Sequence, residues 1–457
     1  MGMTGLLQRS YFAMPNAMQS VALTTYGWRL RFLRYGSYHR SVLRELLDSQ
    51  WYSPVQLEED QFRRLNAVLD HAATRVPFYR TRGLPRRITS LGDLRDLPIL
   101  RKSDIREHQG ENLVSQDEPK HGLEIHTGGT TGTPLTIRCN RASLQRNYAF
   151  FARLLNWAGV PRGSRVATFA GRTLVPPDQS APPYWRMNFA GSALLMSSYH
   201  LSTTTVDAYI ERLRSFQPAL IDSYPSSLEP LARRLLAVGS STIRPRAIVT
   251  SSETLVPATR RLLEEAFGCQ VFDYYGAGEM AAFVSQCESG SYHVNPEFGI
   301  VEILRDGQPV APGETGEIFA TGFVNPVMPL IRYATGDLAV QGSGSCACGR
   351  AFPVIERIEG RVDDVLITPE GRHIGRLDPI FKSAASILEA RIVQDAMDHV
   401  RLDVVPASDY SAAGEALLVQ ELCRRLGPSM RVDVVQLPSI PRERSGKLRM
   451  VVREVPS

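Results

Sequence analysis

The sequence predicts a mixed α/β protein with a large N-terminal domain and a small, mobile α+β C-terminal domain. The 457 residues exceed what one hydrophobic core normally serves, so at least two domains are expected. Strand-like and helix-like segments alternate between residues 165 and 275, which is typical of a largely parallel sheet covered by helices. Past residue 300 short strands and Gly/Pro turns favour a small antiparallel or barrel-like subdomain.

The N-terminal part is expected to be helical. Apolar residues recur at three- and four-residue steps across residues 40–80, and Pro77 should end that run. Residues 28–35 alternate basic and apolar side chains, which is typical of a surface helix packed on its own domain. Peripheral contact of this segment with a membrane surface is the alternative interpretation.

The middle of the chain gives the clearest alternation. We expect strands over residues 165–169, 219–221, 247–250 and 270–274, and helices over residues 205–216, 227–238 and 257–267.

The C-terminal unit follows Gly360-Arg361. We expect a hairpin from residues 391–394 and 400–405, a helix over residues 411–426 closed by Gly427, and a strand over residues 431–437. The predicted domains are residues 1–362 and 363–457.

Composition limits the kind of partner. The chain is 43% hydrophobic and 22% charged with a net charge of +5, which suits a soluble protein with small anionic ligands. The sequence has no basic stripe with interleaved aromatic residues, the pattern that is typical of nucleic-acid binding. It also has no apolar run that is long enough to span a membrane. The N-terminus does not read as a secretory signal, and six cysteines in so long a chain form no disulfide framework. We therefore expect a cytoplasmic protein, as a monomer or homodimer.

The loop at residues 126–135 (His-Thr-Gly-Gly-Thr-Thr-Gly-Thr-Pro-Leu) is the first candidate site. Its glycines let the backbone approach a ligand, and its N–H groups and hydroxyls suit a phosphate. It lies between two strand-like runs but lacks the Gly-Lys-Ser/Thr ending of a P-loop. Alone, such a loop is equally compatible with an ordinary turn.

Four later motifs strengthen that interpretation. They are residues 273–279 (Asp-Tyr-Tyr-Gly-Ala-Gly-Glu), 333–337 (Tyr-Ala-Thr-Gly-Asp), 360–364 (Gly-Arg-Val-Asp-Asp) and 441–447 (Pro-Arg-Glu-Arg-Ser-Gly-Lys). In this order, the five segments resemble the motif series of the adenylate-forming superfamily, which includes acyl-CoA synthetases and adenylation domains. Residues 220–227, Ser252-Glu253 and residues 346–350 (Cys-Ala-Cys-Gly-Arg) further resemble the phenylacetate–CoA ligase family, in particular its branch linked to capsular and surface-polysaccharide genes.

The resemblance implies a reaction in which a carboxylate attacks the α-phosphorus of ATP and pyrophosphate leaves. Both reactants are anions, so the site must neutralise charge and align them. The resemblance assigns the β- and γ-phosphates to Thr127, Gly128, Gly129, Thr130, Thr131 and Gly132. Many relatives have Lys after this Thr-Gly; here Thr133 follows, which suggests weaker pyrophosphate binding.

Other roles follow from the same resemblance. Glu279 would bind Mg²⁺, Tyr275 would stack on the adenine, and Asp337 would accept both ribose hydroxyls. The resemblance also assigns Ser252, Glu253, Tyr274 and Gly276 to the nucleotide site. Arg361 would be a catalytic residue that supports the ribose and phosphate side.

The C-terminal domain carries the last two assignments. Lys447 would reach the α-phosphate and the attacking carboxylate as a point charge on a long stem. Asp363 would be the hinge about which this domain rotates between adenylation and thioester formation.

Cysteine spacing predicts a second, independent site. Cys287, His293, Cys346 and Cys348 supply the four ligands of a tetrahedral, closed and therefore structural Zn²⁺ site. The alternative is four unrelated residues on separate loops.

The predicted function is ATP-dependent activation of an aromatic or small carboxylic acid, followed by transfer to coenzyme A. The alternatives are transfer to an amine or hydroxyl in surface-polysaccharide or natural-product biosynthesis, and a non-catalytic nucleotide-binding relative. The sequence does not identify the residues of the acyl pocket. The candidates are as compatible with core positions as with pocket positions; they are Trp185, Tyr199, His200 and Tyr224.

Overall fold

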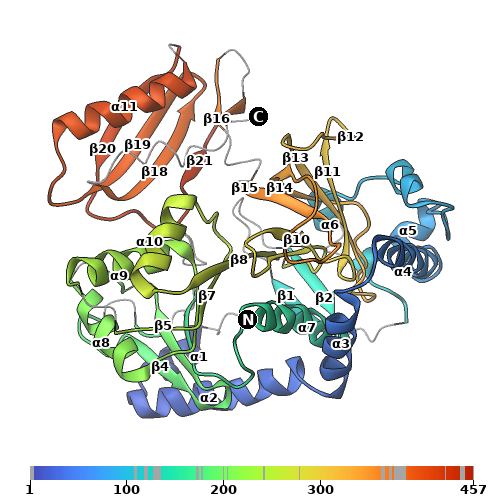
Figure 1. The fold of residues 1–457 in the computed structure, drawn as a ribbon, viewed down its shortest axis with the longest axis horizontal. Coiled ribbons are helices and arrows are strands. Elements are labelled where there is room, and N and C mark those ends of the chain that lie inside the picture. The colour runs from blue at the N-terminus through green and yellow to red at the C-terminus, as the bar shows by residue number, and fades with distance from the viewer. Residues whose placement is uncertain are drawn as a thin grey trace.

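A single 13-stranded sheet is built from strands between residues 166 and 361 (Figure 1). The structure is a computed structural model. It describes residues 5–107, 111–117, 122–126, 135–170, 174–176, 179–198, 200–202, 204–239, 242–276, 278–361, 366–369, 373–374, 387–427, 429–442 and 448–455. The strand order is β12-β11-β13-β14-β15-β10-β9-β8-β7-β6-β3-β5-β4.

The regular elements described before residue 114 are all helices. They are α1 (Gly5–Phe12), α2 (Asn16–Arg34), α3 (Ser37–Ser49), α4 (Pro54–Arg75), α5 (Pro77–Thr81), η1 (Leu91–Asp96), α6 (Lys102–Glu107) and η2 (Glu111–Leu113). The helical run ends before Pro77, as predicted. Pro77 also begins α5, because proline has no N–H to lose at a first helical position.

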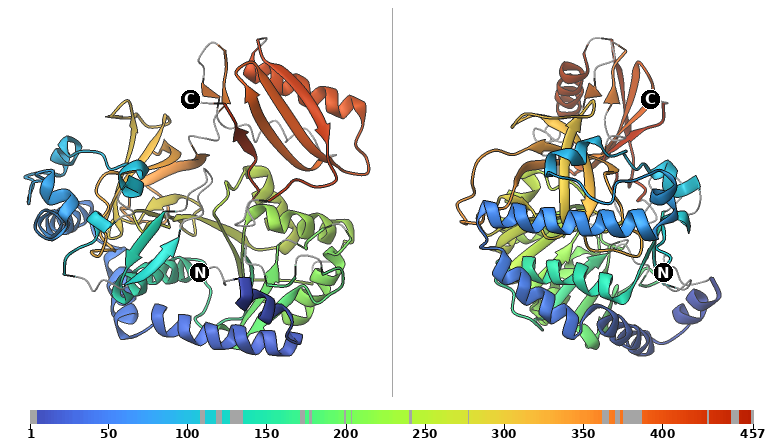
Figure 2. Two further views of the ribbon diagram at one scale, coloured as in Figure 1. Left: turned by 180° about the vertical axis from the view of Figure 1, so that it is seen from behind. Right: turned by 90° about the vertical axis from the view of Figure 1, so that its right-hand side faces the viewer.

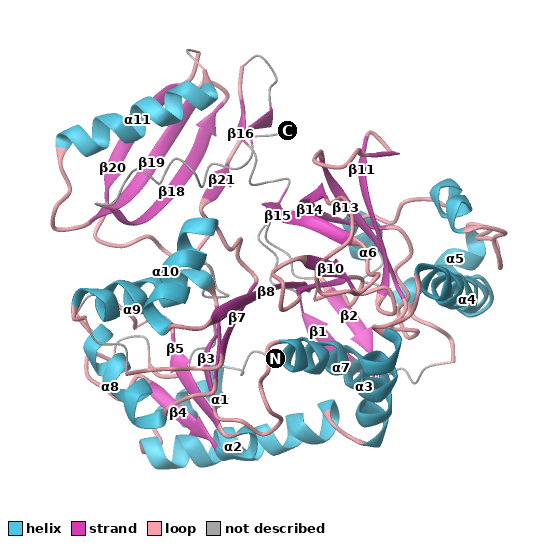
Figure 3. Ribbon diagram, in the orientation of Figure 1, coloured by secondary structure: helices cyan, strands magenta, loops and turns pink. Residues whose placement is uncertain are grey.

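A hairpin and a long helix follow. Strand β1 (Leu123–His126) pairs antiparallel with β2 (Thr136–Cys139), so the two runs that flank the Gly/Thr loop are neighbours. Helix α7 (Arg141–Trp157) then packs beside α3 (Figure 3). Its Arg153 is fully buried and donates from Nη1 to Oε1 of the equally buried Glu297 at 2.8 Å. This ion pair fixes α7 to the connection between β10 and β11.

The parallel half of the sheet confirms the predicted alternation. Its strands are β3 (Val166–Ala170), β5 (Ala193–Ser197), β6 (Leu220–Ser223), β7 (Ala247–Ser251) and β8 (Gln270–Gly276), with β4 (Trp185–Asn188) antiparallel at the edge and η3 (Phe189–Gly191) between β4 and β5. The covering helices are α8 (Val206–Phe216), α9 (Pro225–Ala237) and α10 (Pro257–Phe267). Their apolar faces bury one continuous core against these strands.

The antiparallel half contains the short strands predicted past residue 300, and it continues the same sheet. Its strands are β9 (Phe283–Gln286), β10 (Tyr292–Val294), β11 (Gly299–Arg305), β12 (Gln308–Pro309), β13 (Thr315–Gly322), β14 (Tyr333–Gln341) and β15 (Val354–Arg361). Because β8 pairs with β9, this half is hydrogen-bonded directly to the parallel half.

The C-terminal domain has its own sheet and core. Its elements are β16 (Leu366–Ile367), β17 (His373–Ile374), β18 (Ile387–Ala396), β19 (His399–Pro406), α11 (Ala412–Leu426), β20 (Arg431–Gln436) and β21 (Val451–Arg453). The sheet order is β20-β19-β18-β21, and β18 and β19 form the predicted hairpin. Figure 2 shows this domain above the large sheet in both views.

None of the helices in the described part of the chain is long and apolar enough to cross a membrane.

Candidate functional site

Strand β8 meets the middle of β14 through Tyr275, near the end of β8, and Asp337. The Tyr275 hydroxyl donates to Asp337 Oδ2 at 2.7 Å, although β9, β10 and β15 lie between these strands in the sheet order. The sheet must therefore curl to bring the two residues together. Burial, and then the nearby Asp337 carboxylate, raises the pKa of Tyr275 well above its usual value. The hydroxyl stays protonated and donates to the carboxylate.

Glu279 lies beside this pair, in the turn after β8. The hydroxyl of Tyr333, at the start of β14, donates to Glu279 Oε1 at 3.1 Å. Tyr333 is fully buried, whereas Glu279 and Asp337 are partly exposed. Strand β14 thus supplies Asp337 and the tyrosine that orients Glu279. The two carboxylates stand at a solvent-accessible edge, as a site for a cation and hydroxyl groups requires.

The turn at Gly336 shapes the same edge. Gly336 has φ +75°, a conformation that glycine adopts at low cost, and a Cβ there would lie 3.1 Å from Lys102 Nζ. The main chain opposite Asp337 belongs to Arg361, because the two residues are register partners between β14 and β15. Lys102 therefore lies beside the residue that precedes Asp337. Nothing in the sequence around Lys102 indicates this position.

Tyr274 points to the other face of β8, because successive strand residues alternate. Its ring stacks on Phe283 at 5.4 Å between centroids and meets the edge of Phe151 at 5.6 Å. Burial raises the pKa of its hydroxyl. Of the two adjacent tyrosines, Tyr275 is the one beside Asp337, and Tyr274 packs against α7.

Ser252 and Glu253 follow β7. Ser252 is exposed and has φ +70°. Glu253 accepts hydrogen bonds from the Ser226 N–H at 3.0 Å and its hydroxyl at 2.9 Å, and from the backbone N–H of Leu448 at 3.0 Å. Burial raises the pKa of the Glu253 carboxyl, and these hydrogen bonds lower it. Glu253 therefore joins the start of α9 to the C-terminal domain.

Asp273 is a buried carboxyl in the same motif, and sequence reasoning gave it no role. It accepts hydrogen bonds from the hydroxyls of Thr250 at 2.6 Å and Tyr292 at 2.7 Å. Burial outweighs these bonds and raises the pKa of Asp273 to about 6 from 3.8. Asp273 thus links β8 to β7 and β10 beneath the Tyr275–Asp337 pair.

Asp273→Asn should flatten the pH dependence of stability. Because its folded-state pKa is raised, Asp273 contributes stability below pH 3.8 that is lost as pH rises through about 6. A shift of this size corresponds to about 3 kcal/mol. The free energy of unfolding from urea titrations should fall across this range in the wild type and less in the variant. Asp306→Asn, at an exposed turn, is the control and should keep the wild-type slope.

Several predicted residues lie outside the described part of the chain. They are Thr127, Gly128, Gly129, Thr130, Thr131, Gly132, Asp363 and Lys447. For Arg361 the structure describes the backbone only.

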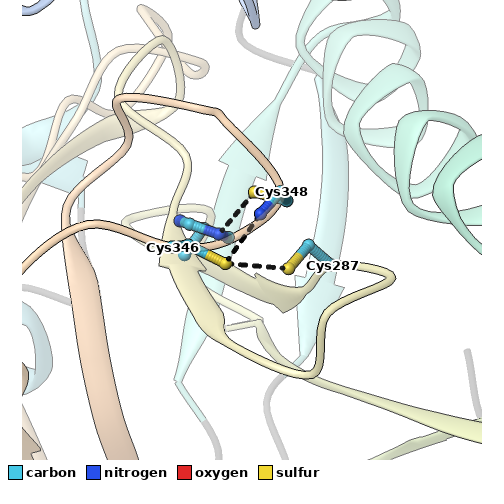
Figure 4. A group of neighbouring side chains, drawn as sticks. Cys287, Cys346 and Cys348 are labelled. Carbon is cyan, nitrogen blue, oxygen red and sulfur yellow. Dashed lines mark hydrogen bonds between the residues drawn. The ribbon is translucent and has the colours of Figure 1, made fainter.

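The four predicted metal ligands converge. All four ligand atoms of Cys287, His293, Cys346 and Cys348 lie within 4.8 Å of one another. Cys287 Sγ is 3.6 Å from Cys346 Sγ, and Cys348 Sγ is 3.4 Å from His293 Nε2 (Figure 4). Tetrahedral Zn²⁺ with Zn–S distances of about 2.3 Å places sulfurs about 3.7 Å apart. The donor set and its spacing therefore fit zinc.

The surroundings of this cluster fix its geometry. The His293 Nδ1 atom lies 3.3 Å from the carbonyl oxygen of Phe352, so Nδ1–H donates there and Nε2 faces the thiols. Burial lowers the pKa of His293 and raises that of Cys287 to about 12. Trp157, Leu57 and Phe352 pack around the sulfurs. The cluster joins the β9–β10 turn to the β14–β15 loop.

His200 is engaged at both ring nitrogens. Nδ1 lies 2.8 Å from Ser197 Oγ and Nε2 lies 3.0 Å from the Pro176 carbonyl oxygen, and the ring stacks on Tyr184. The sequence left His200 as either a core residue or an acyl-pocket residue. These contacts favour an ordinary hydrogen-bonded histidine.

The chain is similar to known proteins in its C-terminal part and along its whole length. Residues 366–454 match the family model described as the CapK C-terminal domain. The chain is 25% identical to Protein CapK of Staphylococcus aureus over 470 residues, covering 98% of this chain and 100% of CapK. It is 25% identical to the phenylacetate-coenzyme A ligase of Thermus thermophilus over 433 residues, covering 87% of this chain and 95% of that protein.

A solved structure shares the fold. The 2-hydroxyisobutyryl-CoA ligase in its postadenylation state aligns with a TM-score of 0.73 at 22% identity, covering 89% of this chain and 92% of that chain. The same ligase in its thioesterification state aligns over the same shares with a TM-score of 0.56.

Fold and relatives together define the class of protein, which is the adenylate-forming superfamily. Within it the chain is similar to phenylacetate-coenzyme A ligases and to CapK, each at 25% identity. The resemblance drawn from the five sequence motifs is confirmed.

Proposed function

We propose that the protein activates a carboxylic acid with ATP and passes the acyl group to coenzyme A. A carboxylate oxygen bonds to the α-phosphorus as the bond to pyrophosphate breaks, and the thiol sulfur then displaces AMP from the acyl carbon. The relatives named as CoA ligases support this reaction. The observation that carries the proposal is the pairing of Tyr275 with Asp337 beside Glu279.

These residues suit the nucleotide. Asp337 is a partly exposed carboxylate whose Oδ2 accepts from Tyr275, and an ionised carboxylate can accept two ribose hydroxyls. Glu279 offers a partly exposed carboxylate, oriented by Tyr333, which fits Mg²⁺. When bound, the cation neutralises phosphate charge. The Gly/Thr loop of residues 127–132 would hold the β- and γ-phosphates, and Ser252, Glu253, Tyr274, Gly276 and Arg361 remain predicted nucleotide-site residues.

The proposed reaction uses two domains, which are residues 1–362 and residues 363–457. Arg442 of the second donates to Ser226 Oγ at 3.1 Å, and the Leu448 N–H donates to Glu253 at 3.0 Å. Both contacts hold the C-terminal domain against the start of α9. The higher TM-score against the postadenylation state than against the thioesterification state supports a matching domain orientation.

Transfer to an amine or hydroxyl is the second candidate. It is favoured by the CapK relationship, which spans the whole chain and includes the C-terminal domain, where the acceptor side of the site would lie. In that case the protein would act in capsular or surface-polysaccharide biosynthesis. The cytoplasm, where ATP is available and where the six free cysteines stay reduced, suits either candidate.

One assay separates these functions. Purified protein is incubated with ATP, Mg²⁺ and a panel of aromatic and small aliphatic acids, with and without coenzyme A. Acid-dependent pyrophosphate exchange establishes adenylation, and an acyl-CoA product establishes the acceptor. Exchange without thioester formation would favour an amine or hydroxyl acceptor. No exchange with any acid would contradict the proposal.

We further propose that Cys287, His293, Cys346 and Cys348 hold a structural zinc ion. The convergence of four ligand atoms from two separate segments supports this site. A closed four-ligand site leaves no position for substrate, so its role is to pin the β9–β10 turn to the β14–β15 loop.

Metal analysis of protein purified without added metal should find about one zinc per chain. Cys346→Ser and Cys348→Ser should each lose the metal and lower the Tm by several degrees, because each removes a ligand and leaves a buried cluster incomplete. Cys423→Ser in α11 is the matched control and should keep the metal. Metal-free wild-type protein of undiminished stability would exclude the site.

A further inference from the structure

The outer side of α2 carries large apolar side chains that are more than half exposed. Met18, Val21, Trp28 and Phe32 are 55%, 62%, 58% and 64% exposed. Their spacing of three, seven and four residues places them on one side of the helix, which we call the α2 apolar face. Phe189 of η3 is 66% exposed and lies beside it, because its N–H donates to Thr24 Oγ1 at 3.1 Å. Large exposed apolar side chains gathered on one side of a helix are typical of an interaction site.

The opposite side of α2 is fixed by packing. Gly27 and Gln19 are buried, and a Cβ at Gly27 would lie 2.3 Å from Asn188 Oδ1 at the end of β4. Arg186 of β4 donates to Gln19 Oε1 at 2.6 Å. The helix cannot rotate to hide its apolar face without breaking these contacts. Figures 1 and 2 show α2 along the outer edge of the molecule, opposite the C-terminal domain.

The surrounding charge is positive. No aspartate or glutamate precedes Glu45 in the sequence. The basic residues of that stretch are Arg9, Arg29, Arg31, Arg34, Arg40 and Arg44. The guanidinium carbon of Arg141 lies 3.9 Å from the Phe32 ring centroid, and that of Arg31 lies 5.6 Å from the Trp28 ring centroid. A second copy would bring the same cations against this face, whereas an anionic surface would neutralise them.

We propose that the α2 apolar face docks the protein on the surface of an anionic membrane. Trp28 and Phe32 insert at the level of the lipid headgroups, and the neighbouring arginines bind the headgroup phosphates. An in-plane helix with aromatic residues on one side and arginines around them has the composition of an interfacial anchor. The helix lies on the bilayer and does not cross it, because its other side is packed on β4. The adenylation site plays no part in this contact.

Vesicle sedimentation tests the proposal. The full chain should sediment with vesicles of phosphatidylcholine and phosphatidylglycerol, much less with phosphatidylcholine alone, and less as salt is raised. Trp28→Glu combined with Phe32→Glu should lower the partition coefficient at least about tenfold, because it removes two insertions and adds two anions. Trp28→Phe should keep binding but lose the tryptophan emission shift on vesicle addition.

Val55→Glu combined with Leu417→Glu is the matched control, since these side chains are 64% and 59% exposed and lie on α4 and α11. It should bind vesicles like the wild type. Circular dichroism checks that both double variants are folded. Failure of the wild type to bind anionic vesicles, or equal losses in the two double variants, would overturn the proposal. So would self-association abolished by the Trp28/Phe32 variant in a protein that does not bind lipid.

Discussion

Lys447→Ala should abolish adenylation while leaving the fold intact. The proposed reaction joins two anions, and Lys447 is the cation that the C-terminal domain would bring to the α-phosphate and the attacking carboxylate. Loss of one preorganised charge of this kind typically costs about 10²–10³-fold in rate. Acid-dependent pyrophosphate exchange measures this step directly. Transfer from a supplied acyl-adenylate to thiol should survive much better, because it does not involve attack at phosphorus.

Arg431→Ala is a suitable control for this variant. It removes one cation from the same domain, but Arg431 is an exposed residue paired with Asp398 on the surface. It should keep near wild-type exchange, since surface ion pairs contribute little. Exchange near the wild-type rate in Lys447→Ala would mean that another group neutralises the reacting anions. Lys102, beside Gly336, would be the first residue to replace next.

Asp363→Pro should separate the two half-reactions. A hinge residue must change φ and ψ, and proline fixes φ near −65°. The contacts of Arg442 with Ser226 and of Leu448 with Glu253 hold one domain orientation. We expect pyrophosphate exchange to survive and transfer to the acceptor to collapse, because transfer requires the domain to rotate away from these contacts.

The control for the hinge is Asp364→Ala, which removes a carboxylate one residue on and keeps backbone freedom. Both half-reactions should remain in that variant. Pyrophosphate exchange and total product are measured in parallel for the two proteins. Equal losses in both half-reactions of Asp363→Pro would place the hinge elsewhere or remove the rotation from the mechanism.

The sequence predicted the regular elements where local signals are strong. Helix α10 has the predicted bounds, because Pro257 opens it and Gly268 closes it in the left-handed conformation. The convergence of the Cys/His cluster was also predictable, since cysteine and histidine in two short segments have few other common uses. By contrast, the continuity of the sheet depends on pairing between β8 and β9, and the sequence pattern of each strand is the same with or without that partner.

The sequence motifs identified residues of the candidate site, but they did not predict the contacts between those residues. Tyr275, Glu279 and Asp337 each belong to a recognisable segment. The hydrogen bond from Tyr333 to Glu279 and the nearness of Lys102 depend on the curl of the whole sheet. Residue spacing carries no information about that curl. The role of Asp273 could not be predicted for a related reason. Its pKa is raised because strands distant in sequence bury its carboxyl group.

The curl of the sheet that brings Tyr275 to Asp337 also determines when the N-terminal domain can complete its fold during synthesis. These partners are 62 residues apart, and three strands must take their places in the sheet before the hydrogen bond can form. The last of them, β15, ends at Arg361. During synthesis, a nascent chain shorter than this would have an incomplete form of the proposed nucleotide site, because non-local strand pairing comes late in folding. Retention of a growing chain by immobilised nucleotide would therefore mark the moment at which the N-terminal domain closes.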